Sequence, residues 1–127
     1  MRASLKTLLV IMAALSFLNG LFYLLLPAFS LSMLQQRTNP IGIMDTRLFG
    51  ACALGLAAIS WLARDFGEAK AQRAVILGNL IALGLMVFVD LDGLLTGAVN
   101  WLGWLLFALD LSLSIGFGYF AVRKFPA

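Results

Sequence analysis

Asp110 is the residue whose type and position most clearly invite chemistry. It lies in the middle of residues 98–122, an apolar stretch long enough to cross a bilayer as a helix. Insertion scales assign a carboxylate at that depth a cost of about 2.5–3.5 kcal/mol. Intramembrane acids either fix helix packing through hydrogen bonds or take part in proton or substrate binding. The sequence leaves both roles open for Asp110.

Arg47 is the basic residue expected at a comparable depth. It lies about 9–10 Å from the start of its helix, and Asp110 lies about 15–18 Å from the start of the last helix. Both helices start from the same side, so we predict an ion pair between the two residues or a shared water. Two alternatives remain: Asp110 hydrogen-bonds to Asn19, Asn79 or serine hydroxyls, and Arg47 is an interfacial anchor.

These considerations define two sets of candidate residues. The candidate binding site or buried polar cluster consists of Asp110, Arg47, Asn19, Asn79 and Asp45. The candidate helix-packing residues, whose small side chains let helices approach closely, are Gly50, Ala51, Gly55, Ser114 and Gly118. Asp110, Ser114 and Gly118 share one helix face by their spacing of four, so this face is expected to look toward other helices and away from lipid.

The residue inventory excludes several kinds of site. The chain has no histidine and one cysteine, Cys52, which excludes an intrachain disulfide, a multi-thiolate metal site, histidine-ligated haem and a Ser-His-Asp triad. We expect no metal and no cofactor. No nucleophile–base pair is visible, so an enzyme is the third possibility, after a scaffold and after a transporter or hydrophobe-binding protein. Asp90 and Asp92 are interpreted as a solvated turn, with an outward-facing cation site as the alternative.

Composition places the chain among membrane proteins. Apolar residues make up 62% of its 127 residues and charged residues 12%, whereas soluble domains have about 45–50% and 25%. We predict an all-α integral membrane four-helix bundle, a single transmembrane domain over residues 1–127. Its spans are expected at about 6–26, 41–63, 73–89 and 98–122, the third being the shortest. Asn39 and Pro40 are expected to begin the second helix.

Two features of this arrangement stay as expectations. Residues 28–36 are too short to span and form either an interfacial helix or a loop. Seven lysine and arginine residues fall on the side of both termini and two fall on the other side, which predicts cytoplasmic termini in a multi-pass protein of the cell membrane. No basic stripe interleaved with exposed aromatic residues is present, so nucleic acid is not an expected partner.

Part of the chain resembles a known group of proteins. The segment Thr46-Arg47-Leu48-Phe49-Gly50, the Asp92-Gly93 dipeptide and the mid-span Asp110 look like small four-span bacterial integral membrane proteins classed as domains of unknown function, in the neighbourhood of the DoxX-like proteins. The resemblance implies a four-helix bundle in the bacterial inner membrane and links Arg47, Gly50 and Asp110. It implies no activity. A weaker similarity to ergosterol-pathway scaffold proteins favours tethering, but this chain lacks their histidine.

Two functions compete on this evidence. The first is a non-enzymatic scaffold or accessory subunit of a membrane complex, whose partners are the lipid bilayer and another membrane protein or a second copy of the chain. The alternative is a small transporter or a lipid- or hydrophobe-binding membrane protein that uses Asp110 as the switchable charge.

Overall fold

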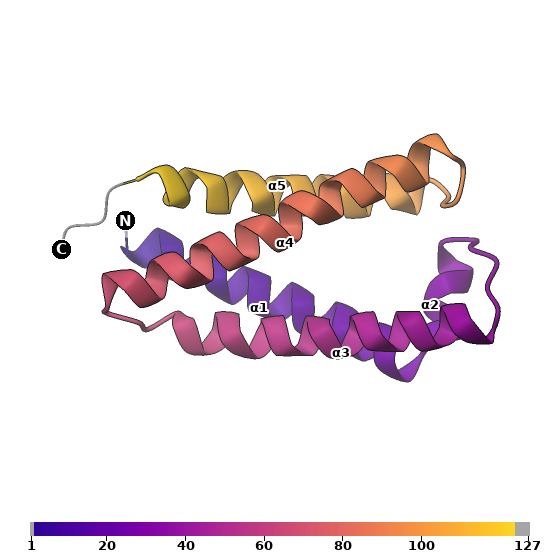
Figure 1. Cartoon of the computed structure of the whole chain (residues 1–127), viewed down its shortest axis with the longest axis horizontal. Coiled ribbons are helices and arrows are strands. Elements are labelled where there is room, and N and C mark those ends of the chain that lie inside the picture. Colours follow the sequence, from indigo (N-terminus) through magenta and orange to yellow (C-terminus); the bar gives the residue numbers. More distant parts are fainter. Residues whose placement is uncertain (1, 124–127) are drawn as a thin grey trace.

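The computed structural model describes residues 2–123, which form helices and short connections without strands (Figure 1). Four helices are long and apolar enough to cross a membrane, as predicted, and a two-turn helix, α2, follows the first of them. The helices are α1 (Arg2–Leu25), α2 (Pro27–Met33), α3 (Pro40–Ala63), α4 (Ala69–Leu95) and α5 (Leu102–Val122). We call the end where α1 begins and α5 ends the terminal end, and the opposite end the α2 end.

Helix α3 begins where its sequence predicts. Asn39 is extended, and its side-chain oxygen accepts a hydrogen bond from the Gly42 N–H at 2.9 Å, while Pro40 occupies the first helical position. This N-cap satisfies one of the amide groups that a helix start leaves free. As a result Asp45 and Arg47 lie within the helix, one to two turns from its start.

The prediction for the third span was wrong at its far end. α4 is the longest helix and runs through Asp90, Asp92 and Gly93, which were interpreted as a turn. A single glycine costs about 1 kcal/mol relative to alanine in a helix, which packing along α5 offsets. The helix ends at Leu95. The N–H of the C-cap residue Thr96 donates to the Asp92 carbonyl at 2.9 Å, and Gly97 follows with a φ of 74°.

The four long helices form two pairs (Figure 1). α1 packs along α3 and α4 packs along α5, whereas contacts between the pairs are fewer. The pairs lie close together near the terminal end and diverge toward the α2 end. The main buried cluster fills the terminal half and consists of Leu5, Leu9, Met12, Ala63, Ile76, Leu83, Leu113, Phe117 and Phe120. The bundle is therefore closed by a core in one half and opens in the other.

Two glycines allow α1 and α3 to cross closely. A Cβ atom at Gly50 would lie 2.6 Å from the Leu24 backbone nitrogen and 2.9 Å from the Gly20 carbonyl oxygen. The rings of Tyr23 and Phe49 meet edge to face beside this crossing, with centroids 5.3 Å apart. The α1–α3 pair therefore depends on the absence of a side chain at Gly50.

A polar contact joins α1 to the connection between α3 and α4 at the terminal end. The Lys6 ammonium donates a hydrogen bond to the Asp65 carboxylate at 2.8 Å, and Arg64 lies 3.4 Å from the other carboxylate oxygen. The hydrogen bond from Lys6 holds the pKa of Asp65 below its ordinary value of 3.8. Both partners of the Lys6–Asp65 pair are exposed, so solvent screens the interaction.

Gly50→Ala is expected to destabilise the protein by about 1–3 kcal/mol, because its methyl group would meet backbone atoms of α1. Gly55→Ala on the same helix is the matched control, since nothing lies within 4 Å of its Cβ position. Thermal unfolding in a mild detergent measures both variants. Equal melting temperatures for the two would contradict the close crossing.

The Lys6–Asp65 contact should give stability a small pH dependence at acid pH. Because the folded-state pKa of Asp65 lies below 3.8, its contribution is present above that value and is lost as the pH falls through the folded pKa. The melting temperature of the wild type should exceed that of Asp65→Asn at pH 7, and the difference should shrink toward pH 3. A difference that stays constant to pH 3 would refute the assignment.

Candidate functional site: an interhelical cleft with two carboxyl groups

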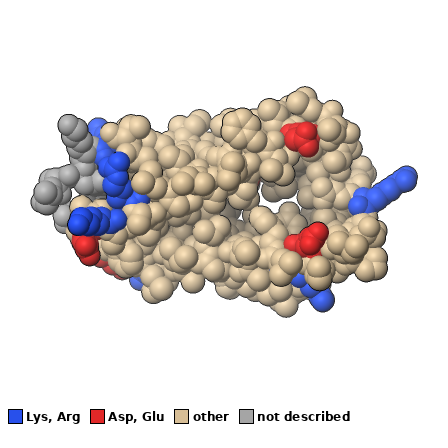
Figure 2. Space-filling view, in the orientation of Figure 1, with Lys and Arg blue, Asp and Glu red and all other residues tan. Residues whose placement is uncertain are grey.

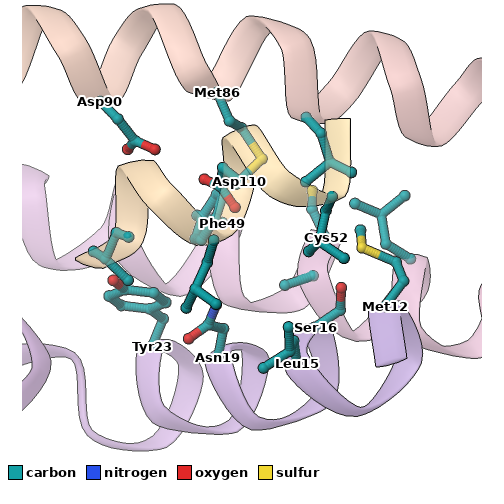
Figure 3. Close-up of a pocket in the computed structure, with 16 residues that line it drawn as sticks. Met12, Leu15, Ser16, Asn19, Tyr23, Phe49, Cys52, Met86, Asp90 and Asp110 are labelled. Carbon is teal, nitrogen blue, oxygen red and sulfur yellow. The ribbon is translucent and has the colours of Figure 1, made fainter. Parts of the chain in front are cut away.

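A cavity of about 150 Å³ lies between the two helix pairs (Figure 3). All four long helices line it, and its polar lining consists of Ser16, Asn19, Tyr23, Asp90 and Asp110, with Cys52 at one wall. Figure 2 shows the molecular surface hollowed between the pairs. An engineered apolar cavity of this volume binds benzene, so the space suits a small molecule or the head of a larger one.

Asp90 of α4 and Asp110 of α5 face one another at this cavity (Figure 3). Both side chains are partly buried, and they are close enough for their charges to interact. One oxygen of Asp90, Oδ2, is fully buried and has no hydrogen-bond donor within residues 2–123. Two like charges in apolar surroundings repel each other strongly, so this pair needs a proton or another cation.

No basic side chain of the described segment balances these carboxyl groups. The ion pairs Lys6–Asp65 and Arg64–Asp65 lie at the terminal end, and neither Asp90 nor Asp110 forms an ion pair with a described residue. Basic side chains gather at that end in Figure 2. The charge of the Asp90–Asp110 pair is therefore left for a proton or a ligand to neutralise.

The predicted Arg47–Asp110 pair does not form in the structure. Arg47 is exposed and forms no ion pair with any residue of the described part of the chain. Phe49, two residues later, lines the cavity. Two residues turn an α-helix by about 200°, so Arg47 lies on the opposite side of α3 from the cavity. The estimate of depth gave no information about this rotation, which decides whether the two side chains meet.

The other members of the predicted polar cluster are separated. Asn19 lines the cavity beside Asp110. Asn79 is buried nearer the terminal end, where its amide donates to the Val75 carbonyl at 3.0 Å and the Ser60 hydroxyl at 3.4 Å. Asp45 is exposed on α3. The alternative hydrogen bond between Asp110 and Asn79 is therefore also absent from the structure.

Some of the predicted helix-packing residues face another helix of the bundle, and others are exposed on its surface. Ser114 and Gly118 face α4, since a Cβ at Gly84 would lie 4.0 Å from the Ser114 hydroxyl and one at Gly118 would lie 3.8 Å from Leu80. Gly50 meets α1, as described above. Ala51 and Gly55 are instead exposed on the surface of α3.

Asp90 and Tyr23 are cavity residues that the sequence predictions missed. Asn79, Leu83, Met86 and Asp90 follow a spacing of four, three and four, which places them on one face of a helix that continues past Val89. Tyr23 follows Ser16 and Asn19 at the same kind of spacing on α1. Both residues were identifiable by periodicity, but only with the correct end of α4 and the correct pairing of helices.

The groups in the cleft can bind a ligand through hydrogen bonds and charge. Carboxylates accept hydrogen bonds and attract cations, and the serine, tyrosine and asparagine side chains both donate and accept. Within the described part of the chain, no three residues of the histidine, cysteine, aspartate and glutamate types gather to hold a metal ion. The two carboxyl groups suit a proton or an organic cation.

The chain belongs to a family known by its sequence model as a domain of unknown function, DUF8292, which matches residues 1–121. No curated protein and no solved structure matches the chain significantly. The family model spans both helix pairs, so the cleft lies within the matched region. It assigns no activity, and the geometry of the cleft carries the functional argument.

Replacing either carboxyl group of the pair is expected to raise the melting temperature at pH 8. Asp90→Asn and Asp110→Asn each remove the repulsion and introduce an amide donor, so the double variant should gain less than the two single variants together. A coupling of about 0.5–3 kcal/mol is typical of neighbouring residues. Asp92→Asn, on the exposed face of the same helix, is the control and should have little effect. Additive effects of Asp90→Asn and Asp110→Asn would show that the two groups do not interact.

Proposed function

We propose that this multi-pass membrane protein binds a small hydrophobic or amphiphilic molecule in the cleft, with Asp110 as the switchable charge. The observation that carries the proposal is the pairing of Asp110 with Asp90 at a cavity lined by all four long helices. Intramembrane acids that face a cavity are characteristic of substrate and proton sites. A hydrogen bond between the two carboxyl groups requires that one of them carry a proton.

The charge of the pair switches because its surroundings are apolar. When both carboxyl groups are ionised, their repulsion strains the α4–α5 interface. A proton or a cationic group relieves that repulsion. A ligand therefore binds the cleft with an affinity that depends on the protonation of the pair. Contacts between the helix pairs are fewer than contacts within each pair, so the cleft lies at the more weakly packed interface.

The distribution of basic residues supports cytoplasmic termini by the positive-inside rule. The cleft then lies in the half of the membrane away from the cytoplasm. The resemblance to small bacterial four-span proteins supports the bacterial inner membrane as the location.

A scaffold or accessory subunit is the second candidate function. It is supported by Ala51 and Gly55 on α3, which are exposed, with nothing within 4 Å of the Cβ position of Gly55. Small residues on a membrane helix let a second helix approach closely. In this case the partner is another membrane protein or a second copy of the chain.

Native mass spectrometry of the protein, extracted from its own membrane in a mild detergent, separates the two functions. We expect a monomer or small homo-oligomer with a retained small molecule, whose occupancy falls at least fivefold in Asp110→Asn and stays unchanged in Asp92→Asn. A fixed stoichiometric protein partner without a retained molecule would overturn the binding proposal and favour the scaffold.

A further inference from the structure

A second cavity adjoins the one that holds the carboxyl groups. It has a volume of about 240 Å³ and lies between α1, α2 and α5. Apart from Asn19, Tyr23 and Ser30, its lining is aliphatic or aromatic, with Leu102 and Leu105 on the α5 side. We call it the α2 compartment. It is large and apolar enough for a hydrocarbon chain but offers no charged group.

The two cavities share a wall. Asn19, Tyr23 and Leu106 line both of them, so the α2 compartment begins where the carboxyl-bearing cavity ends. A molecule that fills both has a polar part beside Asp90 and Asp110 and an apolar part beneath α2. This division of polarity is that of an amphiphile.

Hydrogen bonds hold α2 in place over the α2 compartment. The side-chain amide of Asn100 donates to the Met33 carbonyl at 2.9 Å, and its backbone N–H donates to the Leu34 carbonyl at 3.2 Å. These bonds tie the end of α2 to the connection between α4 and α5. The α2 compartment is therefore held between elements of both helix pairs.

Polar groups without partners point into the carboxyl-bearing cavity. The Ser16 side chain is 8% exposed and directed into the cavity (Figure 3), and its hydroxyl makes no hydrogen bond to any part of the described chain. The buried Oδ2 of Asp90 also lacks a donor there. Ser16 and Asp90 therefore keep hydrogen-bonding capacity for a molecule in the cavity, whereas the Asn79 Oδ1 and the Ser114 hydroxyl, also unpartnered within residues 2–123, do not line it.

The charge of the cavity indicates which polar head group a ligand would carry. Asp90 and Asp110 have no basic partner, and the ring of Tyr23 lies at the same cavity with Phe49 beside it. An ammonium group pairs with carboxylates and also interacts favourably with aromatic faces. An anionic or neutral head supplies no counter-charge, so the carboxyl groups would then depend on protonation alone.

We propose that the cleft binds a cationic amphiphile, with an ammonium head between Asp90 and Asp110 and an apolar chain in the α2 compartment. This inference rests on the proposed binding function and names its ligand class. The Ser16 hydroxyl and the Asn19 amide oxygen accept the remaining hydrogen bonds of the head. The hydrocarbon chain of the ligand passes from the carboxyl-bearing cavity into the α2 compartment beside Leu106.

Cys52 offers a direct readout, because it is the single cysteine of the chain, is exposed and lines the carboxyl-bearing cavity. The full-length protein in phosphatidylcholine nanodiscs is treated with a small maleimide in the presence of decylamine, decanol or butylamine. Decylamine should slow the modification of Cys52 at least tenfold. At the same concentration, decanol without the charge and butylamine without the chain should slow it less than twofold.

Two pairs of variants locate the head and the chain. Asp110→Asn should abolish the difference between decylamine and decanol, and Asp92→Asn should preserve it. Leu105→Trp fills the α2 compartment and should weaken protection by decylamine at least fivefold. Leu111→Trp adds the same bulk on α5 outside both cavities and should leave protection unchanged. If Asp110→Asn does not fold, Asp90→Asn replaces it.

The outcomes distinguish a failure of the cationic amphiphile from a failure of the proposed binding function. Equal protection by decanol and decylamine would overturn the cationic head and leave the proposed binding function standing. Equal protection by butylamine, or full protection in Leu105→Trp, would overturn the placement of the chain. If the maleimide reaches Cys52 and none of the three probes slows it, both the cationic amphiphile and binding of alkyl hydrophobes in the cleft are refuted.

Discussion

Close approach of helix backbones is the constraint on which the rest of this structure depends. Lipid chains are as apolar as leucine side chains, so membrane helices gain little from hiding apolar surface and associate where small residues let them pack closely. α1 and α3 meet this way at Gly20 and Gly50. α4 packs along α5 at ordinary contact distance, with the Ser114 hydroxyl 4.0 Å from the Cβ position of Gly84. Both contacts lie within a pair, so the molecule consists of two pairs in place of an evenly packed bundle.

The cleft follows from this pairing. Between the pairs, large side chains such as Phe117 and Ile76 fill the terminal half, whereas the α2 end lacks a comparable core. Polar side chains in a membrane protein collect where they avoid lipid. Asp90 and Asp110 accordingly face the space between the pairs, together with Ser16 and Asn19 from the opposite side.

Much of the fold was predictable from the sequence, because apolar length and capping are local properties. The four long helices and the Asn39 cap needed no knowledge of neighbours. The end of α4 was not predictable this way, since packing on α5 outweighs the local turn signal of Asp90–Gly93. Asp110 was identified from its cost in lipid, but its partner depends on helix rotation and pairing. Arg47 has a depth similar to that of Asp110, but its side chain lies on the side of α3 away from Asp110.

The two carboxyl groups belong to the same helix pair, and this determines what neutralising them does. Their repulsion acts across the α4–α5 interface, one turn from the contact between Ser114 and Gly84. A proton would relieve it within that pair alone. A larger cation that also reaches Ser16 or Asn19 would join α4 and α5 to α1, and so couple the two pairs. Protonation and ligand binding therefore neutralise the same charge with different results. Protonation would leave the cleft open, whereas a bound ligand would connect the two helix pairs across it.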